Sequence, residues 1–297
     1  MSSFLRRLTL GSTALGLALT AACSSGATPV GSTGPDPTVA ENVSFPAGSP
    51  MARLHDAGTI RIGTKFDQPL FGQLNPVAGV PQGFDVEIGK IIAAELGIPA
   101  DKIEWVETVS ANREPFLQQG RVDLVIATYT INDKRKEVID FGGPYYVAGQ
   151  SLMVAAGNPK AINGPQDTAG KKVCSVEGSA SSTNLRDLVP GVEMVLFDSY
   201  SKCADALKNG QADAVTTDNT ILAGLRSLDP EAFELVGPTF TEEPYGIGIA
   251  KGNDQLVQFV DDTLTASFTD GRWAAAWDET AGTVLGEALA PPDLASA

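Results

Sequence analysis

The sequence has one histidine, three cysteines and fewer basic than acidic residues, and each shortage excludes a class of function. His55 precedes the first expected strand, so we expect no Ser-His-Asp or Cys-His nucleophilic system and no enzymatic activity. One histidine and two distant cysteines do not make a His/Cys zinc site, so we expect no metal. YGIGIAKG (245–252) lacks the spacing of G-x-G-x-x-G and opens no helix, so we expect no nucleotide cofactor. The net charge of −15 argues against nucleic acid as a partner, because neutralising phosphates requires clustered Lys and Arg.

The N-terminus has the pattern of an export signal. Arg6 and Arg7 precede an apolar run, Leu8 to Leu19, that is too short to span a bilayer. Small residues then lead to Cys23, which resembles the lipidated cysteine of a bacterial lipobox. We expect residues 1–22 to be a signal peptide and Cys23 a lipid anchor that holds the protein outside the cell on the membrane. A plain signal peptide cut nearby is the alternative.

Residues 23–50 are rich in Ser, Gly, Thr, Pro and Ala, a composition that predicts a flexible tether. With Cys23 lipidated, Cys174 and Cys203 are the only possible disulfide pair in an exported, oxidising setting. Two unpaired buried thiols are the alternative.

One sequence motif, the repeated phrase, occurs twice in the chain, as LQQGRVDLVIAT (117–128) and LKNGQADAVTTD (207–218). Around each copy, apolar alternation and helical spacing predict a strand-helix-strand-helix-strand unit, which implies two α/β lobes with parallel sheets covered on both faces. In each copy Gly closes a helix, Asp lies in the turn, and the strand runs to the sheet edge where ligands of open α/β sheets bind. Asp85 is interpreted as a helix cap and Gly97 as the end of that helix.

The extended segments between and after the units predict two crossings between the lobes. We expect lobe 1 to comprise 51–145 and 245–297, lobe 2 to comprise 149–241, and 145–149 and 241–245 to be hinge strands. The C-terminal helical stretches should return to lobe 1. An unrelated two-domain α/β protein is the alternative.

Four segments in order, GFDVEI, VDLVIATYTINDKRKEVIDFGGPYY, DAVTTD and EPYGIGIAKG, are together specific for a known family. Over about residues 51–285 the chain resembles the extracytoplasmic amino-acid-binding proteins of ABC importers (solute-binding protein family 3), and is most similar to the actinobacterial lipoprotein glutamate-binding branch. The resemblance implies the two-lobed periplasmic-binding-protein fold of type II.

The resemblance also implies how the main-chain end of an amino acid is held. Arg135 would pair with the α-carboxylate and Asp218 with the α-ammonium, from opposite lobes. Other family positions would donate hydrogen bonds to the carboxylate; these are Thr128, Thr130, Ser179, Ala180 and Ser181. From the residues alone, Arg135 is equally a helix-surface charge and 179–181 a helix N-cap run.

The ligand side chain would be recognised by Lys65, Ser110 and Arg113. SANR (110–113) fits the Ser-x-Asn-Arg pattern of glutamate/aspartate-binding relatives, whereas Lys65 replaces their usual arginine. Solvated surface charges are the alternative for the two basic residues.

We therefore expect a monomer that binds glutamate, or aspartate, and delivers it to an ABC permease. Binding of glutamine or asparagine, a sensory amino-acid-binding module, and an enzyme on the same scaffold, such as a dehydratase or peptidoglycan lyase, are the alternatives.

Overall fold

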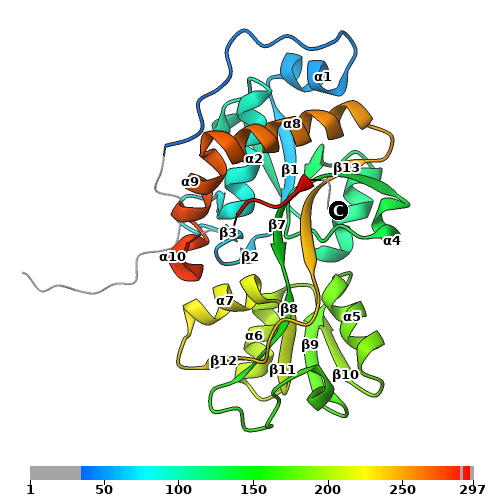
Figure 1. Cartoon of the computed structure of the whole chain (residues 1–297), viewed down its shortest axis with the longest axis vertical. Coiled ribbons are helices and arrows are strands. Elements are labelled where there is room, and N and C mark those ends of the chain that lie inside the picture. Colours follow the sequence, from blue (N-terminus) through cyan, green and yellow to red (C-terminus); the bar gives the residue numbers. More distant parts are fainter. Residues whose placement is uncertain (1–34, 288–289, 295–297) are drawn as a thin grey trace, which may run out of the picture.

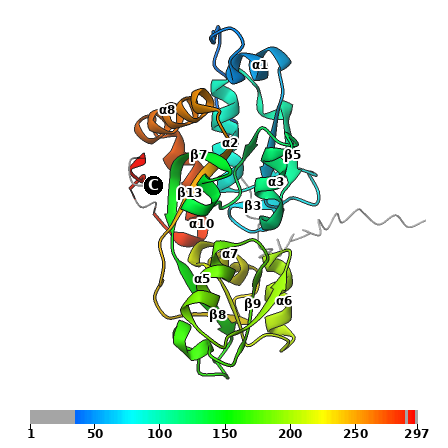
Figure 2. The ribbon, with the colours of Figure 1, turned by 90° about the vertical axis from the view of Figure 1, so that its right-hand side faces the viewer.

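Two lobes, each built around a five-stranded sheet, make up the computed structural model, which describes residues 35–287 and 290–294 (Figures 1 and 2). The expected two-lobed α/β architecture is confirmed. The expected signal peptide, 1–22, and Cys23 lie outside the described residues. Within the described ranges, no helix has the length and apolar character needed to cross a membrane.

The sheet of lobe 1 has the strand order β5-β1-β6-β13-β7. Its strands are β1 (Ile60–Thr64), β5 (Ile103–Glu107), β6 (Leu124–Val125), β7 (Ile139–Ala148) and β13 (Glu243–Ala250). The first three in sequence are parallel, whereas β13 runs antiparallel to both β6 and β7.

The sheet of lobe 2 repeats this plan in the order β10-β9-β11-β8-β12. Its strands are β8 (Gln150–Ala155), β9 (Lys172–Val176), β10 (Glu193–Phe197), β11 (Ala214–Asp218) and β12 (Phe233–Val236). Again three strands are parallel, and β8 is antiparallel to β11 and β12. The repeated units supply the expected parallel strands, and chain segments from outside the two units complete each sheet with strands that pair antiparallel.

The repeated phrase has the same structural role in both lobes. Gly120 and Gly210 have φ of 62° and 70°, a left-handed conformation that suits glycine, and they end the helices before β6 and β11. Asp123 accepts a hydrogen bond from the backbone N–H of Arg61, and Asp213 accepts one from that of Lys172. Each Asp therefore ties the turn to the start of the neighbouring strand.

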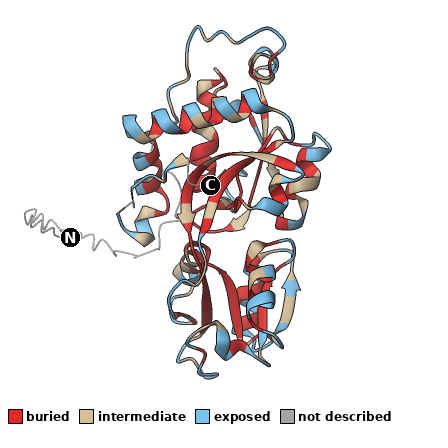
Figure 3. Cartoon of the chain, turned by 45° about the vertical axis from the view of Figure 1, so that its right-hand side comes forward, coloured by how far each residue is buried: buried red, intermediate tan, exposed pale blue. Residues whose placement is uncertain are grey.

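Helices cover the sheets, whose strands are the most buried part of the molecule (Figure 3). Lobe 1 has α1 (Pro50–Ala57), α2 (Phe84–Glu95), α3 (Arg113–Gln118), α4 (Asp133–Lys136), α8 (Asp254–Asp270), α9 (Arg272–Glu279) and α10 (Gly282–Leu285). Lobe 2 has α5 (Ala180–Leu188), α6 (Tyr200–Lys208) and α7 (Asn219–Leu228). Short 3₁₀ turns lie at Ala100–Lys102, Ser110–Asn112 and Pro165–Thr168. A small sheet of β2 (Asp67–Gln68), β3 (Gly72–Leu74) and β4 (Pro81–Gln82) lies between β1 and α2.

Aromatic side chains fix the C-terminal helices to lobe 1. Trp273 and Trp277 lie one turn apart on α9 and are both buried. Trp277 stacks on Tyr146 of β7 with ring centroids 4.9 Å apart and meets Phe84 of α2 edge-on at 5.3 Å. Burying such rings contributes much of a core's stability.

The segment expected to be a flexible tether is packed on lobe 1 where the structure describes it. Asp36 forms an ion pair with Lys90 of α2 at 2.9 Å, and the N–H of Ala40 donates to the carbonyl of Ala94. The ring of Phe45 contacts Phe259 of α8, with centroids 5.7 Å apart. The expectation is corrected for residues 35–49, because one aromatic and one acidic side chain find partners on α2 and α8.

The expected disulfide is present in the structure. Cys174 of β9 and Cys203 of α6 are joined; they are 29 positions apart in sequence, and their Cα atoms are 5.5 Å apart. The bond fastens α6 to the sheet of lobe 2.

Candidate functional site

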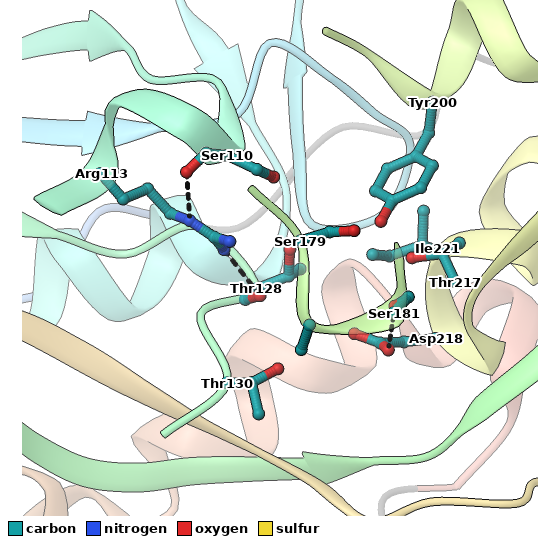
Figure 4. A pocket seen from close by; sticks show the side chains of 11 residues that line it. Ser110, Arg113, Thr128, Thr130, Ser179, Ser181, Tyr200, Thr217, Asp218 and Ile221 are labelled. Atoms are coloured by element: carbon teal, nitrogen blue, oxygen red, sulfur yellow. Dashed lines mark hydrogen bonds between the residues drawn. The ribbon is translucent and has the colours of Figure 1, made fainter. Parts of the chain in front are cut away.

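A small cavity lies between the lobes, where the carboxyl ends of the parallel strands of both sheets meet (Figure 4). About 230 Å³ of atom-free space lies within and at the mouth of the cavity, including space open to solvent. Lobe 1 contributes Ser110, Arg113, Thr128 and Thr130, and lobe 2 contributes Ser179, Ala180, Ser181, Tyr200, Thr217, Asp218 and Ile221. Eight of the ten residues predicted to bind ligand therefore line one cavity, and Lys65 and Arg135 do not.

Lys65 reaches the cavity wall through Ser110. Its Nζ donates to Ser110 Oγ at 2.8 Å, and only 2% of the Lys65 surface is exposed. Burial, reinforced by the positive charge of Arg113, lowers the pKa of Lys65 to about 7. Near neutral pH its charge is therefore sensitive to an anion placed close to it.

Arg113 is buried and bonded to backbone carbonyls on three sides. Its guanidinium donates to the carbonyls of Ser110, Ala127 and Thr128 at 3.2–3.3 Å, and to Gly178 of lobe 2 at 3.3 Å. It also lies over the ring of Tyr129, 4.2 Å from the centroid. Arg113 thus holds a positive charge at the cavity and links the two lobes.

Arg135 lines a larger neighbouring cavity, which shares Ser179 and Ala180 with the first. Its Nη1 donates to the carbonyl of Thr130 at 2.6 Å, its Nη2 to that of Gly178 at 3.2 Å, and its Nε pairs with Glu114 at 3.2 Å. Burial, and then the charge of Arg113, lower its pKa to about 10. The guanidinium is bonded to the carbonyl of Thr130, a residue of the first cavity, but does not itself line the cavity that contains Asp218.

Asp218 ends β11 on the opposite wall and is 4% exposed. Its Oδ2 accepts a hydrogen bond from Tyr245 Oη at 2.6 Å and its Oδ1 one from Ser181 Oγ at 3.4 Å. Burial, and then the nearby Glu243, raise its pKa to about 7. In the part of the chain that the structure describes, no basic side chain forms a salt bridge with Asp218. A buried carboxylate of this kind favours a cation supplied by a ligand.

The start of α5 presents backbone N–H groups beside Asp218. Ser179 is the N-cap: its Oγ accepts from the N–H of Ser182 at 3.0 Å and donates to the carbonyl of Val176 at 2.7 Å. The hydroxyl of Ser179 is thus already used, whereas N–H groups in a first helical turn lack partners within the helix. The backbone of Ala180 and Ser181 is the available donor for an anion here.

Sequence reasoning missed several groups at the site. Thr217 Oγ1, which lines the cavity, and Gln68 Nε2 are buried without a hydrogen-bond partner among the described residues. Gln68 Oε1 accepts from Thr128 Oγ1 at 2.9 Å. Thr217 precedes Asp218 in the repeated phrase, so its place at the strand end could have identified it as a cavity residue. Nothing in the sequence marks Gln68 or the cavity-lining Tyr200.

The interpretation of Asp85 as a helix cap was wrong. The N-cap of α2 is Gly83, and Asp85 is fully buried. Its carboxylate accepts from the N–H of Thr128 at 2.8 Å and from Tyr145 Oη at 2.6 Å, and burial raises its pKa to about 6. Asp85 fixes the backbone of Thr128, whose φ of 44° is unusual for a residue other than glycine.

His55 lies on α1, away from the cavity, and its Nδ1 is 2.9 Å from the carbonyl oxygen of Leu96. No group of His, Cys, Asp and Glu side chains with the arrangement of a metal site occurs in the described residues.

Comparison with known proteins identifies the class. Residues 60–280 match the model of the bacterial extracellular solute-binding proteins, family 3, and the chain belongs to this family. It is 40% identical to the ABC transporter glutamine-binding protein GlnH of Bacillus subtilis, covering 75% of this chain and 81% of that one. It is 37% identical to the glutamate-binding protein GluB of Corynebacterium efficiens, covering 76% and 79%.

The fold agrees with this assignment. The solute receptor for L-cysteine of Neisseria gonorrhoeae superposes with a TM-score of 0.75 at 32% identity, covering 80% of this chain and 95% of that one. The recognition of an amino-acid-binding protein of ABC importers from the sequence, with the type II two-lobed fold, is confirmed.

Proposed function

We propose that this protein captures an acidic L-amino acid, glutamate or aspartate, between its lobes and delivers it to an ABC permease. One observation carries the proposal. Asp218 lies buried on the lobe 2 wall, and Arg113 lies on the lobe 1 wall of the same small cavity, where Ser110 accepts a hydrogen bond from the buried amine of Lys65. An amino acid carries both complementary charges, so it bridges the two walls and favours the closed form.

The α-ammonium pairs with Asp218 in this proposal. The α-carboxylate lies between the start of α5 and the segment 128–135, where Thr128, Thr130 and the backbone at Ala180 and Ser181 supply donors. Arg135 completes this set if one of its N–H groups leaves the carbonyl of Thr130 and donates to an oxygen of the ligand instead. Its three present partners all accept from it, so the guanidinium is already oriented at this boundary.

Lys65, Ser110 and Arg113 receive the ligand side chain. Two buried cations next to one serine favour a carboxylate over an amide, because charge-assisted hydrogen bonds contribute about 1.5–3 kcal/mol each. Such a contact corresponds to roughly 10- to 100-fold discrimination. The names of the relatives do not decide the matter, since glutamine binding is attributed to GlnH and glutamate binding to GluB at similar identity.

A neutral ligand, glutamine or asparagine, is the second candidate, and one observation favours it. The pKa of Lys65 is lowered to about 7, so about half of the molecules carry an uncharged amine there at neutral pH. The guanidinium of Arg113 is also already bonded to carbonyl oxygens.

We further propose that 145–149 and 241–245 are the hinge strands and that the remaining lobe boundaries lie at 51–145 with 245–297 and at 149–241. Lipidation of Cys23 would anchor a monomer to the outer face of the cell membrane, close to the permease.

Calorimetric titration of the purified chain with glutamate, aspartate, glutamine and asparagine tests the function. We expect glutamate or aspartate to bind at least about tenfold more tightly than either amide. Tighter binding of an amide would replace the acidic ligand by the second candidate. Absence of heat and of thermal stabilisation with all four would reject amino-acid capture in this cavity.

A further inference from the structure

The lobes touch at a second place, where the edge strand β2 of lobe 1 meets α6 and α7 of lobe 2. The contact segment is Asp67–Pro69, and neither Asp67 nor Pro69 lines the cavity. The carboxylate of Asp67 accepts a hydrogen bond from the backbone N–H of Tyr200, the first residue of α6, at 2.7 Å. This bond crosses from one lobe to the other over 133 residues of sequence.

The start of α6 lacks a cap from its own side chains. Ser199 occupies the N-cap position, but its side chain caps nothing and lies 3.2 Å from Ser201 Oγ instead. Carboxylates are preferred at helix N-termini, where they satisfy free N–H groups and interact favourably with the helix dipole. In this molecule the capping carboxylate comes from the other lobe, so α6 is capped only when the lobes are together.

Gly224 of α7 makes the second half of this contact. A Cβ at Gly224 would lie 2.5 Å from the carbonyl oxygen of Pro69 and 3.2 Å from its carbonyl carbon. No side-chain movement relieves a contact with backbone. Glycine inside a helix is otherwise unfavourable relative to alanine, so its presence in α7 fits a requirement for close approach.

We propose that Asp67 and Gly224 form a latch that sets the balance between the open and closed forms, and thereby the affinity for every ligand, without touching the ligand. The inference rests on the proposed function. A ligand that binds only the closed form has an apparent dissociation constant equal to the intrinsic value divided by the closed-form population. Changes in the latch should therefore multiply the dissociation constants of all amino acids by one factor, whereas changes in the cavity should alter these constants unequally.

The sharper test is Gly224→Ala in the full chain, with Ser227→Ala as control. Ser227 lies on the same helix and donates only to the carbonyl of Gly224 within that helix. We expect Gly224→Ala to raise the melting temperature of the ligand-free protein by about 2–4 °C through higher helix propensity. We expect it to weaken glutamate and glutamine alike, by at least about tenfold, because closing now meets a backbone clash. Ser227→Ala should leave both affinities unchanged.

Asp67→Asn is the second variant, with the exposed Asp101→Asn as its control. The amide keeps the shape of the carboxylate but removes the charge. The amide oxygen can still accept the hydrogen bond, so only the interaction of the charge with the helix dipole is lost. We expect stopped-flow kinetics to show ligand dissociation about two- to fivefold faster for both amino acids with Asp67→Asn, and no change with Asp101→Asn.

The outcomes separate the latch from the function. If the wild type binds none of the amino acids, the proposed function is wrong and the latch falls with it. If the wild type binds and Gly224→Ala binds equally well, the latch is rejected and the function stands. A drop in both melting temperature and affinity with Gly224→Ala, or unequal effects on the two ligands, also rejects it.

Discussion

Tyr245 in β13 of lobe 1 donates a 2.6 Å hydrogen bond from its Oη to Oδ2 of Asp218 in β11 of lobe 2. The same oxygen of Tyr245 lies 3.2 Å from Thr220 Oγ1, and its ring is buried against Phe71 in the core of lobe 1. Tyr245 stands where the chain crosses between the lobes. The carboxylate proposed to receive the ligand's ammonium is thus held by the crossing strand.

Tyr245→Phe should weaken all amino acids by about 10- to 100-fold at pH 7, since hydrogen bonds to charged groups contribute about 1.5–3 kcal/mol. Burial raises the pKa of Asp218 and the bond from Tyr245 opposes that rise, so losing the bond should raise the pKa further and move optimal binding to higher pH. Titrations at pH 6, 7 and 8 measure both effects. Tyr146→Phe, in the neighbouring strand and stacked on Trp277, is the control and should bind normally.

Lys65→Met should weaken glutamate by about tenfold or more while changing glutamine little, because methionine fills similar space without charge. Arg113→Ala should weaken the binding free energy of glutamate by about 2 kcal/mol or more. It also removes bonds to Ala127, Thr128 and Gly178, so it should weaken glutamine binding as well, by less.

Arg135→Ala and Asp218→Ala should lower the affinity for every amino acid by a similar factor. Equal losses for glutamate and glutamine with Lys65→Met would remove that residue from side-chain recognition.

The sequence was sufficient for the two-lobed fold because the same local signals occur twice. Gly120 and Gly210 end their helices, and Asp123 and Asp213 tie the turns, so each repeat forms one half of a symmetric plan. The mixed strand directions were missed because the sequences of β8 and β13 indicate strands but not their direction. The direction of each strand in its sheet depends on the lobe from which the chain enters.

The candidate site was predictable where a residue stands at a strand end, as Asp218 does. The role of Asp85 was not predictable, nor were the contacts that hold Arg135, since their partners, Tyr145 for one and Gly178 for the other, are distant in sequence. Composition likewise described 35–49 as a tether, because a single aromatic residue, Phe45, does not alter an average but does supply an anchor.

Phe45→Ala should therefore lower the free energy of unfolding by about 1–2 kcal/mol, less than the loss of a fully buried ring. The half-buried side chain packs against His55 and Phe259, so the loss is one of contact area. Chemical denaturation measures it, and Val77→Ala, at a side chain that is 95% exposed, should have no effect. A Phe45→Ala protein as stable as the wild type would show that the segment adds nothing to lobe 1.

Reduction of the Cys174–Cys203 bond should lower stability by about 3–4 kcal/mol in the chain-entropy model for a loop of this length. Mass analysis without reductant should find no free thiol in the purified exported chain. The double variant Cys174→Ala with Cys203→Ala should match the reduced protein in its melting temperature. Two alkylatable cysteines in the native preparation would contradict the bond.

Proton exchange on binding should distinguish the ligand classes. The raised pKa of Asp218, about 7, means that the ligand-free native state holds this proton more tightly than the unfolded chain does. The contribution of Asp218 to stability therefore falls as pH rises from about 4 to about 7. An ammonium requires the carboxylate, so binding of any amino acid at pH 6 should release protons from Asp218.

Lys65 acts in the opposite direction, because its pKa is lowered to about 7 and a bound carboxylate requires its charged form. At pH 8 glutamate should therefore take up protons through Lys65 and release few through Asp218, whereas glutamine should show little exchange. Calorimetry in two buffers of different ionisation enthalpy measures the protons exchanged. Lys65→Met should abolish the uptake of protons by glutamate. Identical proton exchange for glutamate and glutamine at pH 8 would mean that Lys65 does not face the ligand's side chain, and the acidic ligand would lose its main support.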